Sequence, residues 1–279
     1  MKKTEKISRW LNHSTLIHGF STKELGNLSF RTGNKSIITE RRKEFAVRLG
    51  FNWNDAVIPS LTHSNNIVLI DNKSSLSKDI EGSYLSGGRF VSPKKKVSTV
   101  HYNPEWQAGI DGFIVSVPGV FPVILTADCA ALALFHPASQ IIAIGHVGII
   151  GAINQLPKIL IYALGEFCGC NSSELEAVIY PSIRVCHYDL SRSGAWNVIG
   201  KNVRAYYGKG NEFYRYGHFD LQGFVKWQLV ETGVQHKNIC DTNLCTVCYK
   251  KDFFSNFRAS TSALKLREGR FASVIGTRR

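Results

Sequence analysis

The sequence predicts a layered α/β or α+β fold, in which helices cover β-sheets. Several short apolar runs lie between turn residues, as in strands that are buried on both faces. Other segments carry apolar residues at helical spacing, which gives each predicted helix one core-facing stripe. Because strands and helices are mixed along the chain, we expect sheets covered by helices in one continuous domain, residues 1–279.

The strands are predicted from near-continuous hydrophobicity over short lengths, bounded by turn residues such as Gly and Pro. A run of this kind is too short for a typical helix. The predicted strands lie at residues 112–117, 122–126, 131–135, 141–145, 177–180, 253–257 and 271–275.

The first predicted helix covers residues 39–49, with Thr39 as its N-cap and Gly50 as a left-handed stop. Its polar face carries Arg41, Arg42 and Lys43. Further helical stripes lie at residues 153–167, with Pro157 at a kink or in the first turn, at 196–206, closed by Gly208, and at 221–229, stopped by Gly233.

A change of composition marks residues 71–109, where Ser, Gly and Lys dominate and Pro93-Lys94-Lys95-Lys96 lies in the middle. This composition predicts a long, lightly structured insertion. Its lysines are more typical of a solvated loop than of a polyanion-binding surface.

The net charge favours anionic partners. Lys and Arg number 34 against 21 Asp and Glu, which gives +13 and an isoelectric point near 9.5. A merely basic surface, nucleic acid, a phosphorylated small molecule and an acidic membrane all agree with this charge.

Cysteine usage and hydropathy predict the compartment. The seven cysteines are odd in number and no apolar segment follows the charged N-terminus, so we expect free thiols and a reducing, cytoplasmic location. The most apolar stretch, residues 120–153, is interrupted by Asp128, His136, Pro137 and His146, so no membrane span is predicted.

Three residues are candidates for chemistry. Cys129 follows the strand at 122–126, and His146 follows the strand at 141–145. If these strands are parallel neighbours, both side chains emerge at the sheet edge where ligands usually bind. His63 lies in a polar break before the next apolar run.

Several interpretations of these residues stay open. Cys129 and His146 fit a nucleophilic pair whose ring is oriented by Asp128 or an Asn. Together with His63 they also fit a zinc site with one open position, although the same donors bind blue copper. A buried thiol and structural histidines are the simpler alternative. Cys245-Thr246-Val247-Cys248 and Cys168-Gly169-Cys170 are interpreted as free thiols.

The order of local motifs along nearly the whole chain resembles the YfiH-like laccase-domain, or polyphenol oxidase, family. The motifs are His18-Gly19-Phe20-Ser21-Thr22-Lys23, His63, Asp111-Gly112-Phe113-Ile114, Leu125-Thr126-Ala127-Asp128-Cys129, His146-Val147-Gly148, Tyr180-Pro181-Ser182-Ile183, Tyr188-Asp189, Phe219-Asp220-Leu221, Cys245-Thr246, Phe253-Phe254-Ser255, Arg258 and Gly269-Arg270.

The resemblance implies mixed sheets packed between helices and a zinc site at His63, Cys129 and His146, with copper as the second choice. It implies purine nucleosides and phosphate as partners, rather than nucleic acid or a membrane. Family members split adenosine, inosine, guanosine and methylthioadenosine with phosphate, and deaminate adenosine. On this basis, Asp128 is expected to transfer a proton or orient a ligand. Arg258 and Arg270 are expected to contact phosphate.

One departure from the family lies beside the expected ligands. An aromatic residue and a cation usually follow His-Ala-Gly, whereas this chain has Ile149 and Ile150 after His146-Val147-Gly148. We therefore expect retained metal binding with altered nucleoside activity. A non-catalytic nucleotide-binding protein, a copper-dependent phenol oxidase and a Cys-His hydrolase are the alternatives. The copper oxidase ranks low because the sequence contains no His-X-His pair.

Overall fold

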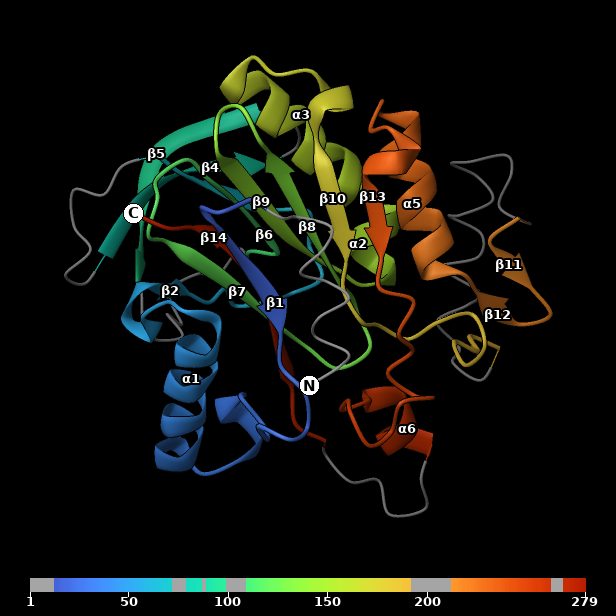
Figure 1. Cartoon of the computed structure of the whole chain (residues 1–279). Helices are drawn as coiled ribbons and strands as arrows, with labels where there is room; N and C mark the ends of the chain where they lie inside the picture. The colour runs from blue at the N-terminus through green and yellow to red at the C-terminus, as the bar shows by residue number, and fades with distance from the viewer. Residues whose placement is uncertain (1–12, 72–78, 87–88, 99–108, 192–211, 262–267) are drawn as a thin grey trace.

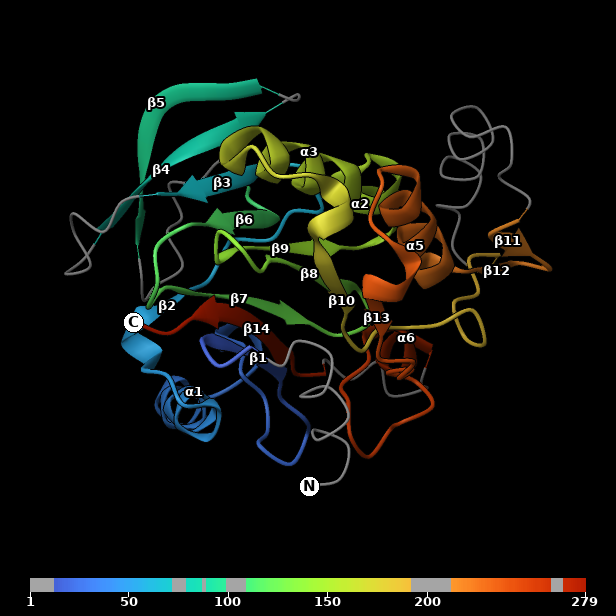
Figure 2. The same ribbon diagram turned by 45° about the horizontal axis from the view of Figure 1, so that its top comes forward.

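The computed structural model describes residues 13–71, 79–86, 89–98, 109–191, 212–261 and 268–279. These residues form two large sheets that pack on each other, with helices on both outer faces (Figures 1 and 2). The layered α/β arrangement that the sequence predicts is therefore confirmed.

The larger sheet has eight strands and the smaller one has four. In spatial order, the larger contains β13 (Ile239–Asp241), β10 (Glu176–Ile179), β8 (Ala130–His136), β9 (Ile141–Val147), β6 (Gly112–Val115), β3 (Ile67–Ile70), β4 (Asp79–Ser86) and β5 (Arg89–Ser98). The smaller contains β1 (Leu16–Phe20), β14 (Phe271–Thr277), β7 (Phe121–Thr126) and β2 (Ala56–Val57), while β11 (Tyr214–Arg215) and β12 (His218–Phe219) form a separate ribbon.

The helices cover the outer faces of both sheets (Figure 2). The described α-helices are α1 (Lys35–Leu49), α2 (Ile149–Ile153), α3 (Leu156–Cys168), α5 (Leu221–Glu231) and α6 (Asn256–Thr261). Short 3-10 helices lie at Phe30–Thr32, Trp53–Asp55, Ser172–Glu174 and His236–Asn238.

Three apolar clusters connect the four layers. Because side chains alternate along a strand, Ile114 of β6 packs towards α3 while Phe113 packs between the two sheets. The third cluster joins the smaller sheet to α1. Both sheet faces of β6 are therefore buried, which explains its continuous hydrophobicity.

The structure corrects several predicted boundaries. Helix α1 begins at Lys35 rather than residue 39, because Asn34 caps the backbone N–H groups of Ser36 and Ile37. Gly50 is left-handed, with φ 83°, as expected. Pro157 lies in the first turn of α3.

The C-terminal and insertion segments also differ from the prediction. The predicted strand at 253–257 is wrong, since these residues form a loop and the start of α6. The insertion at 71–109 contains the hairpin β4–β5, which extends the larger sheet beside β3. The predicted helix at 196–206 lies outside the described residues.

Cys168 and Cys170 form a disulfide bond at the end of α3, so the expectation of free thiols is wrong for this pair. Cys129, Cys186, Cys240, Cys245 and Cys248 are free thiols, as expected.

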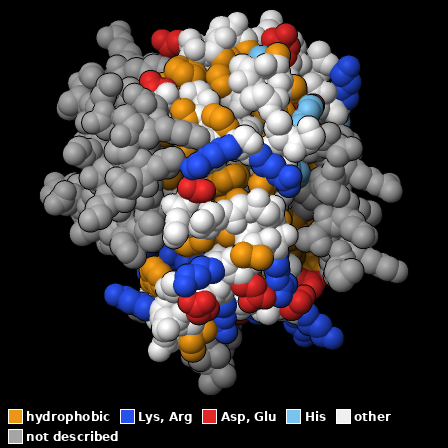
Figure 3. Space-filling model, turned by 60° about the vertical axis from the view of Figure 1, so that its left-hand side comes forward, with side chains coloured by type: hydrophobic (Ala, Val, Ile, Leu, Met, Phe, Trp, Pro, Cys, Tyr) orange, Lys and Arg blue, Asp and Glu red, His pale blue; other side chains and the backbone are white. Residues whose placement is uncertain are grey.

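Part of the positive charge lies on α1, away from the larger sheet. Figure 3 shows Lys and Arg side chains gathered over the lower part of one face, where α1 lies, with acidic side chains among them. Lys43 pairs with Glu40 and Arg48 pairs with Glu44 on the helix itself. Among the described residues, no helix has the length and apolar character needed to cross a membrane.

Candidate metal centre

One edge of the larger sheet collects the predicted ligands. Strands β3 and β6 are parallel, β9 runs antiparallel to β6, and β8 runs antiparallel to β9. The starts of β3, β6 and β8 therefore meet the end of β9. His63 and Asp111 precede β3 and β6, Cys129 directly precedes β8, and His146 lies near the end of β9.

This arrangement differs from the one considered from the sequence, in which the strands at 122–126 and 141–145 were parallel neighbours. The strand before Cys129, β7, belongs to the smaller sheet, whereas β9 belongs to the larger one. Cys129 approaches His146 because the next strand, β8, pairs with β9 in a register that places Ala131 opposite His146.

The structure brings His63, Cys129 and His146 together. One ligand atom from each lies within 4.8 Å of the other two. The Cys129 Sγ is 3.8 Å from His63 Nε2, and the two imidazole ring centres are 4.8 Å apart. His146 is buried, Cys129 is half-buried and His63 is exposed, so the group has one side open to solvent.

The carboxylate of Asp111 holds the two histidine segments of this group in place. It is fully buried and accepts hydrogen bonds from the backbone N–H groups of Thr62, His63 and Ser64, and from the Ser64 hydroxyl. Its Oδ1 is also 2.8 Å from His146 Nδ1. Burial raises the pKa of Asp111, but the bonds from His146 and Ser64 outweigh burial and lower it below its ordinary value. Asp111 therefore stays ionised.

An ionised Asp111 determines how the His146 ring is used. Since the carboxylate only accepts hydrogen bonds, His146 Nδ1 carries the proton and Nε2 is left for a ligand. Burial lowers the pKa of His146, yet Cys129 and Asp111 raise it to about 9. Burial raises the pKa of Cys129, yet His146 and His63 lower it to about 6. The metal-free pair is thus a thiolate and an imidazolium, and the thiolate is the form that binds metals.

Gly148 allows the close approach of two of these side chains. A Cβ atom at this position would lie 2.9 Å from His63 Cδ2 and 3.0 Å from Cys129 Sγ. Gly148 also precedes α2, whose first residues are Ile149, which is buried, and Ile150, which is 45% exposed. The departure from the family therefore places an apolar side chain at the surface close to the group.

Asp128 fixes the short connection that carries Cys129. Its backbone has φ 104°, a region that favours glycine, and its carbonyl accepts from Ile183 N at 2.7 Å. One carboxylate oxygen accepts from the Thr246 hydroxyl at 2.7 Å and the other from Phe257 N at 2.6 Å. Burial raises the pKa of Asp128 despite these bonds. Both oxygens thus have partners within the protein.

The two predicted phosphate contacts have different surroundings. Arg258 pairs with Glu268 at 2.9 Å and donates to the carbonyls of Thr246 and Phe253. It would have to leave these partners to bind phosphate, and its predicted role stays a prediction. In the described part of the chain, Arg270 has no carboxylate partner at this distance but donates through Nη1 to the carbonyls of Glu268 and Gly269, at 3.1 and 3.0 Å, and burial lowers its pKa.

A cavity of about 660 Å³ adjoins Arg270. Its wall includes Leu61 and Leu125, which belong to the segments leading to His63 and Cys129. It combines several cations with apolar and aromatic surface, a combination suited to an anionic group joined to a flat ring. The lining residues include Phe30, Arg31, Lys35, Leu61, Leu125 and Arg270.

The sequence predicted His63, Cys129 and His146 as ligands and Asp128 as a residue that orients a ligand, but it gave no such role to Asp111. Asp111 belongs to the Asp111-Gly112-Phe113-Ile114 motif and lies next to a buried strand, a place where a carboxylate needs partners. Tyr188, which belongs to the Tyr188-Asp189 motif, was also given no role. Burial raises the pKa of Tyr188, and the charges of Cys129 and Asp128 add to the effect.

A family model described as "Multi-copper polyphenol oxidoreductase laccase" matches residues 13–278. The chain therefore belongs to this laccase-like family, which confirms the resemblance seen in the motifs. The structure is similar to the crystal structure of YlmD from Geobacillus stearothermophilus, with a TM-score of 0.73, 19% identity, and 95% and 93% of the two chains covered. It is also similar to that of YfiH from Bacillus licheniformis, with a TM-score of 0.71, 22% identity, and 94% and 92% covered.

Relatives with named activities are distant. Adenosine deaminase RL5, from an unknown prokaryotic organism, is 24% identical over 238 residues, which is 82% of this chain and 80% of the relative. Purine nucleoside phosphorylase YlmD of Bacillus subtilis is 26% identical over 166 residues, 60% of this chain and 58% of the relative. Human purine nucleoside phosphorylase LACC1 is 25% identical over 58% of this chain and 40% of the relative.

The role of Asp111 gives a testable prediction. In Asp111→Asn the neutral amide cannot hold an imidazole N–H and the loop N–H groups as strongly, so zinc affinity should fall about 10- to 100-fold. Competition with a chromophoric chelator measures the affinity. Asp71→Asn, at the other end of β3 and exposed, is the matched control. Unchanged zinc affinity in folded Asp111→Asn would contradict the organising role of this carboxylate.

Proposed function

We propose that this protein is a zinc-dependent purine nucleoside phosphorylase. Its expected substrates are adenosine, inosine, guanosine or methylthioadenosine together with phosphate, and deamination of adenosine is a second reaction at the same site. The approach of the ligand atoms of His63, Cys129 and His146 to one another, with His146 held by the buried Asp111 carboxylate, carries this proposal. The printed activities of the distant relatives supply the substrate class.

The donor set fits zinc. One thiolate and two imidazoles are common zinc ligands, and three protein donors leave a position open, as in catalytic sites. When bound, zinc would supply a Lewis acid that can activate water or polarise a substrate oxygen. Copper accepts the same donors and is the second choice.

The chain's own residues would bind and orient the substrates. Arg270, with Arg31 and Lys35 in the same cavity, supplies positive charge for phosphate, while Leu61 and Leu125 supply apolar surface for the purine. In phosphorolysis, a phosphate oxygen bonds to ribose C1′ as the bond from C1′ to the purine breaks, and the leaving base takes up a proton. Asp128 acts as a positioning residue, because its oxygens hold Thr246 and Phe257.

Zinc content and base release test the proposal together. The variants His63→Ala, Cys129→Ala and His146→Ala should each lose zinc from this site and lose phosphate-dependent release of base from adenosine or inosine. His236→Ala, which removes an exposed histidine, is the control. Product analysis by chromatography also detects inosine formed from adenosine. Zinc-loaded wild type that is stabilised by nucleosides but forms no product would instead identify a binding protein.

The proposed phosphate contact of Arg270 gives a separate prediction. Arg270→Ala should raise the KM for phosphate about 10- to 100-fold, the range for losing one charge-assisted contact, with little change in zinc content. Steady-state kinetics at varied phosphate concentration measures this effect. Arg215→Ala, an exposed arginine in β11, serves as the control. An unchanged KM would show that phosphate binds elsewhere.

A Cys-His hydrolase is the second candidate, because the metal-free geometry has the order of a catalytic triad. Cys129 faces His146, and His146 is oriented by Asp111 rather than by Asp128. The approach of His63 Nε2 to the same sulfur is the observation that favours a metal instead.

Alkylation of Cys129 distinguishes a zinc enzyme from a Cys-His hydrolase. With a Cys129 pKa of about 6, iodoacetamide should label this thiolate rapidly at pH 7 in chelator-treated protein, and zinc should suppress the labelling. Mass spectrometry of peptides gives the rate for Cys129, with buried Cys240 as the internal reference. Labelling that zinc does not slow, together with turnover of an ester probe, would favour the hydrolase.

A further inference from the structure

A separate group of metal-binding side chains lies beyond the ends of β10 and β13. These strands are parallel neighbours, so the loops that follow them leave the sheet at the same end. The first loop carries Cys186 and His187, and the second carries Cys245 and Cys248. A β-bridge between Ser182 and Cys245 holds the loops side by side.

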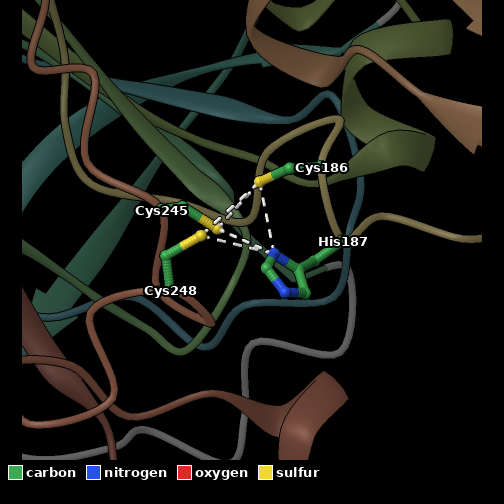
Figure 4. A group of neighbouring side chains, drawn as sticks. All are labelled: Cys186, His187, Cys245 and Cys248. Atoms are coloured by element: carbon green, nitrogen blue, oxygen red, sulfur yellow. Dashed lines mark hydrogen bonds between the residues drawn. The ribbon is translucent and has the colours of Figure 1, made fainter.

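The four side chains point towards a common centre (Figure 4). The Cys186 Sγ lies 3.7 Å from the Sγ atoms of both Cys245 and Cys248. The His187 Nδ1 lies 3.2 Å from the sulfur of Cys186, 3.4 Å from that of Cys248 and 3.8 Å from that of Cys245. All four ligand atoms are within 4.8 Å of one another.

These separations are close to those of a tetrahedral zinc site. Zinc bonds of about 2.3 Å to sulfur and about 2.0–2.1 Å to nitrogen place the sulfurs about 3.8 Å apart and each sulfur about 3.6 Å from the nitrogen. We propose that Cys186, His187, Cys245 and Cys248 bind a structural zinc ion, in addition to the site at His63.

The donor set distinguishes this site from the first one. Three sulfurs and one imidazole complete four-coordinate zinc and leave no position open, as in structural sites. Cys245 and Cys248 are separated by two residues, the spacing of many zinc loops. From the sequence alone this pair was interpreted as free thiols, because Cys186 and His187, about sixty positions away, were not recognised as its partners.

Backbone hydrogen bonds and an ion pair fix the two loops that carry the cysteines. Burial raises the pKa of Cys245 but backbone hydrogen bonds lower it below its ordinary value, whereas burial raises the pKa values of Cys186 and Cys248. Arg184 also forms a two-pronged ion pair with Asp241, with distances of 2.8 and 2.9 Å, which ties the first loop to the end of β13. The thiols are therefore held near one another by groups that do not themselves bind metal.

A zinc ion here would stabilise the connection to the first site. Thr246 lies between the two cysteines of the second loop, and its hydroxyl donates to Asp128. Asp128 precedes Cys129 in the chain. Binding of zinc by Cys245 and Cys248 therefore limits the movement of the residue that holds Asp128, and through it the Cys129 connection.

Zinc counting in the full-length protein tests the proposal without an activity assay. The double variant Cys129→Ala, His146→Ala leaves only His63 at the first site, yet it should retain one zinc per chain when purified under reductant. Adding Cys248→Ala should remove that zinc and lower the unfolding temperature. Adding Cys240→Ser, at a buried thiol outside the group, should leave one zinc.

X-ray absorption at the zinc edge of the double variant identifies the ligands. We expect three sulfurs at about 2.3 Å and one nitrogen at about 2.0–2.1 Å. Adding Cys248→His, which keeps a ligand, should restore zinc and change the shell to two sulfurs and two nitrogens. The proposal is overturned if the double variant holds no zinc, if zinc persists in the Cys248→Ala protein, or if intact mass shows a disulfide among these cysteines.

Discussion

The buried carboxylate of Asp111 is the interaction on which the candidate metal centre depends. It lies directly before β6, between the segments that carry His63 and His146, and it holds both. A charge in a fully buried position is stable only with several hydrogen bonds. The backbone of the loop at residues 62–64 provides them, so the same bonds that stabilise Asp111 determine where His63 lies.

The layered fold supplies the setting for this interaction. Strand β6 is covered on both faces, which keeps Asp111 away from water while its loop partners remain near the surface. On the other side of the group, Asp128 anchors Cys129 through Thr246 and Phe257. The two histidines are therefore held through Asp111 and Cys129 is held through Asp128, and the three candidate ligands meet only because the strands pair in this order.

Local patterns predicted β6–β10 and β14, because burial on both faces produces continuous apolar runs, whereas β1–β5 and β11–β13 were not predicted as strands. Pairing could not be predicted in the same way, since it depends on contacts between distant segments. For this reason β7 and β9 were considered as neighbours, although they belong to different sheets. The predicted strand at 253–257 failed because its aromatic residues pack as a loop around the core.

Contacts between distant segments also limited the prediction of the two candidate metal sites. Three candidate ligands could be selected from the sequence because Cys and His beside strand ends are informative, and the family resemblance supported this selection. The role of Asp111 and the partners of Cys245 could not be predicted, because they depend on the approach of distant residues in space. Only the folded chain brings residues 186 and 187 to residues 245 and 248.

Anomalous X-ray scattering from crystals of the zinc-loaded protein tests the central claim most directly. Data collected above and below the zinc edge should give a difference peak bounded by His63, Cys129 and His146, present only above the edge. Such a peak would establish both the position and the element. A well-ordered site without a peak, with Cys129 hydrogen-bonded to His146 alone, would contradict a metal centre organised by Asp111.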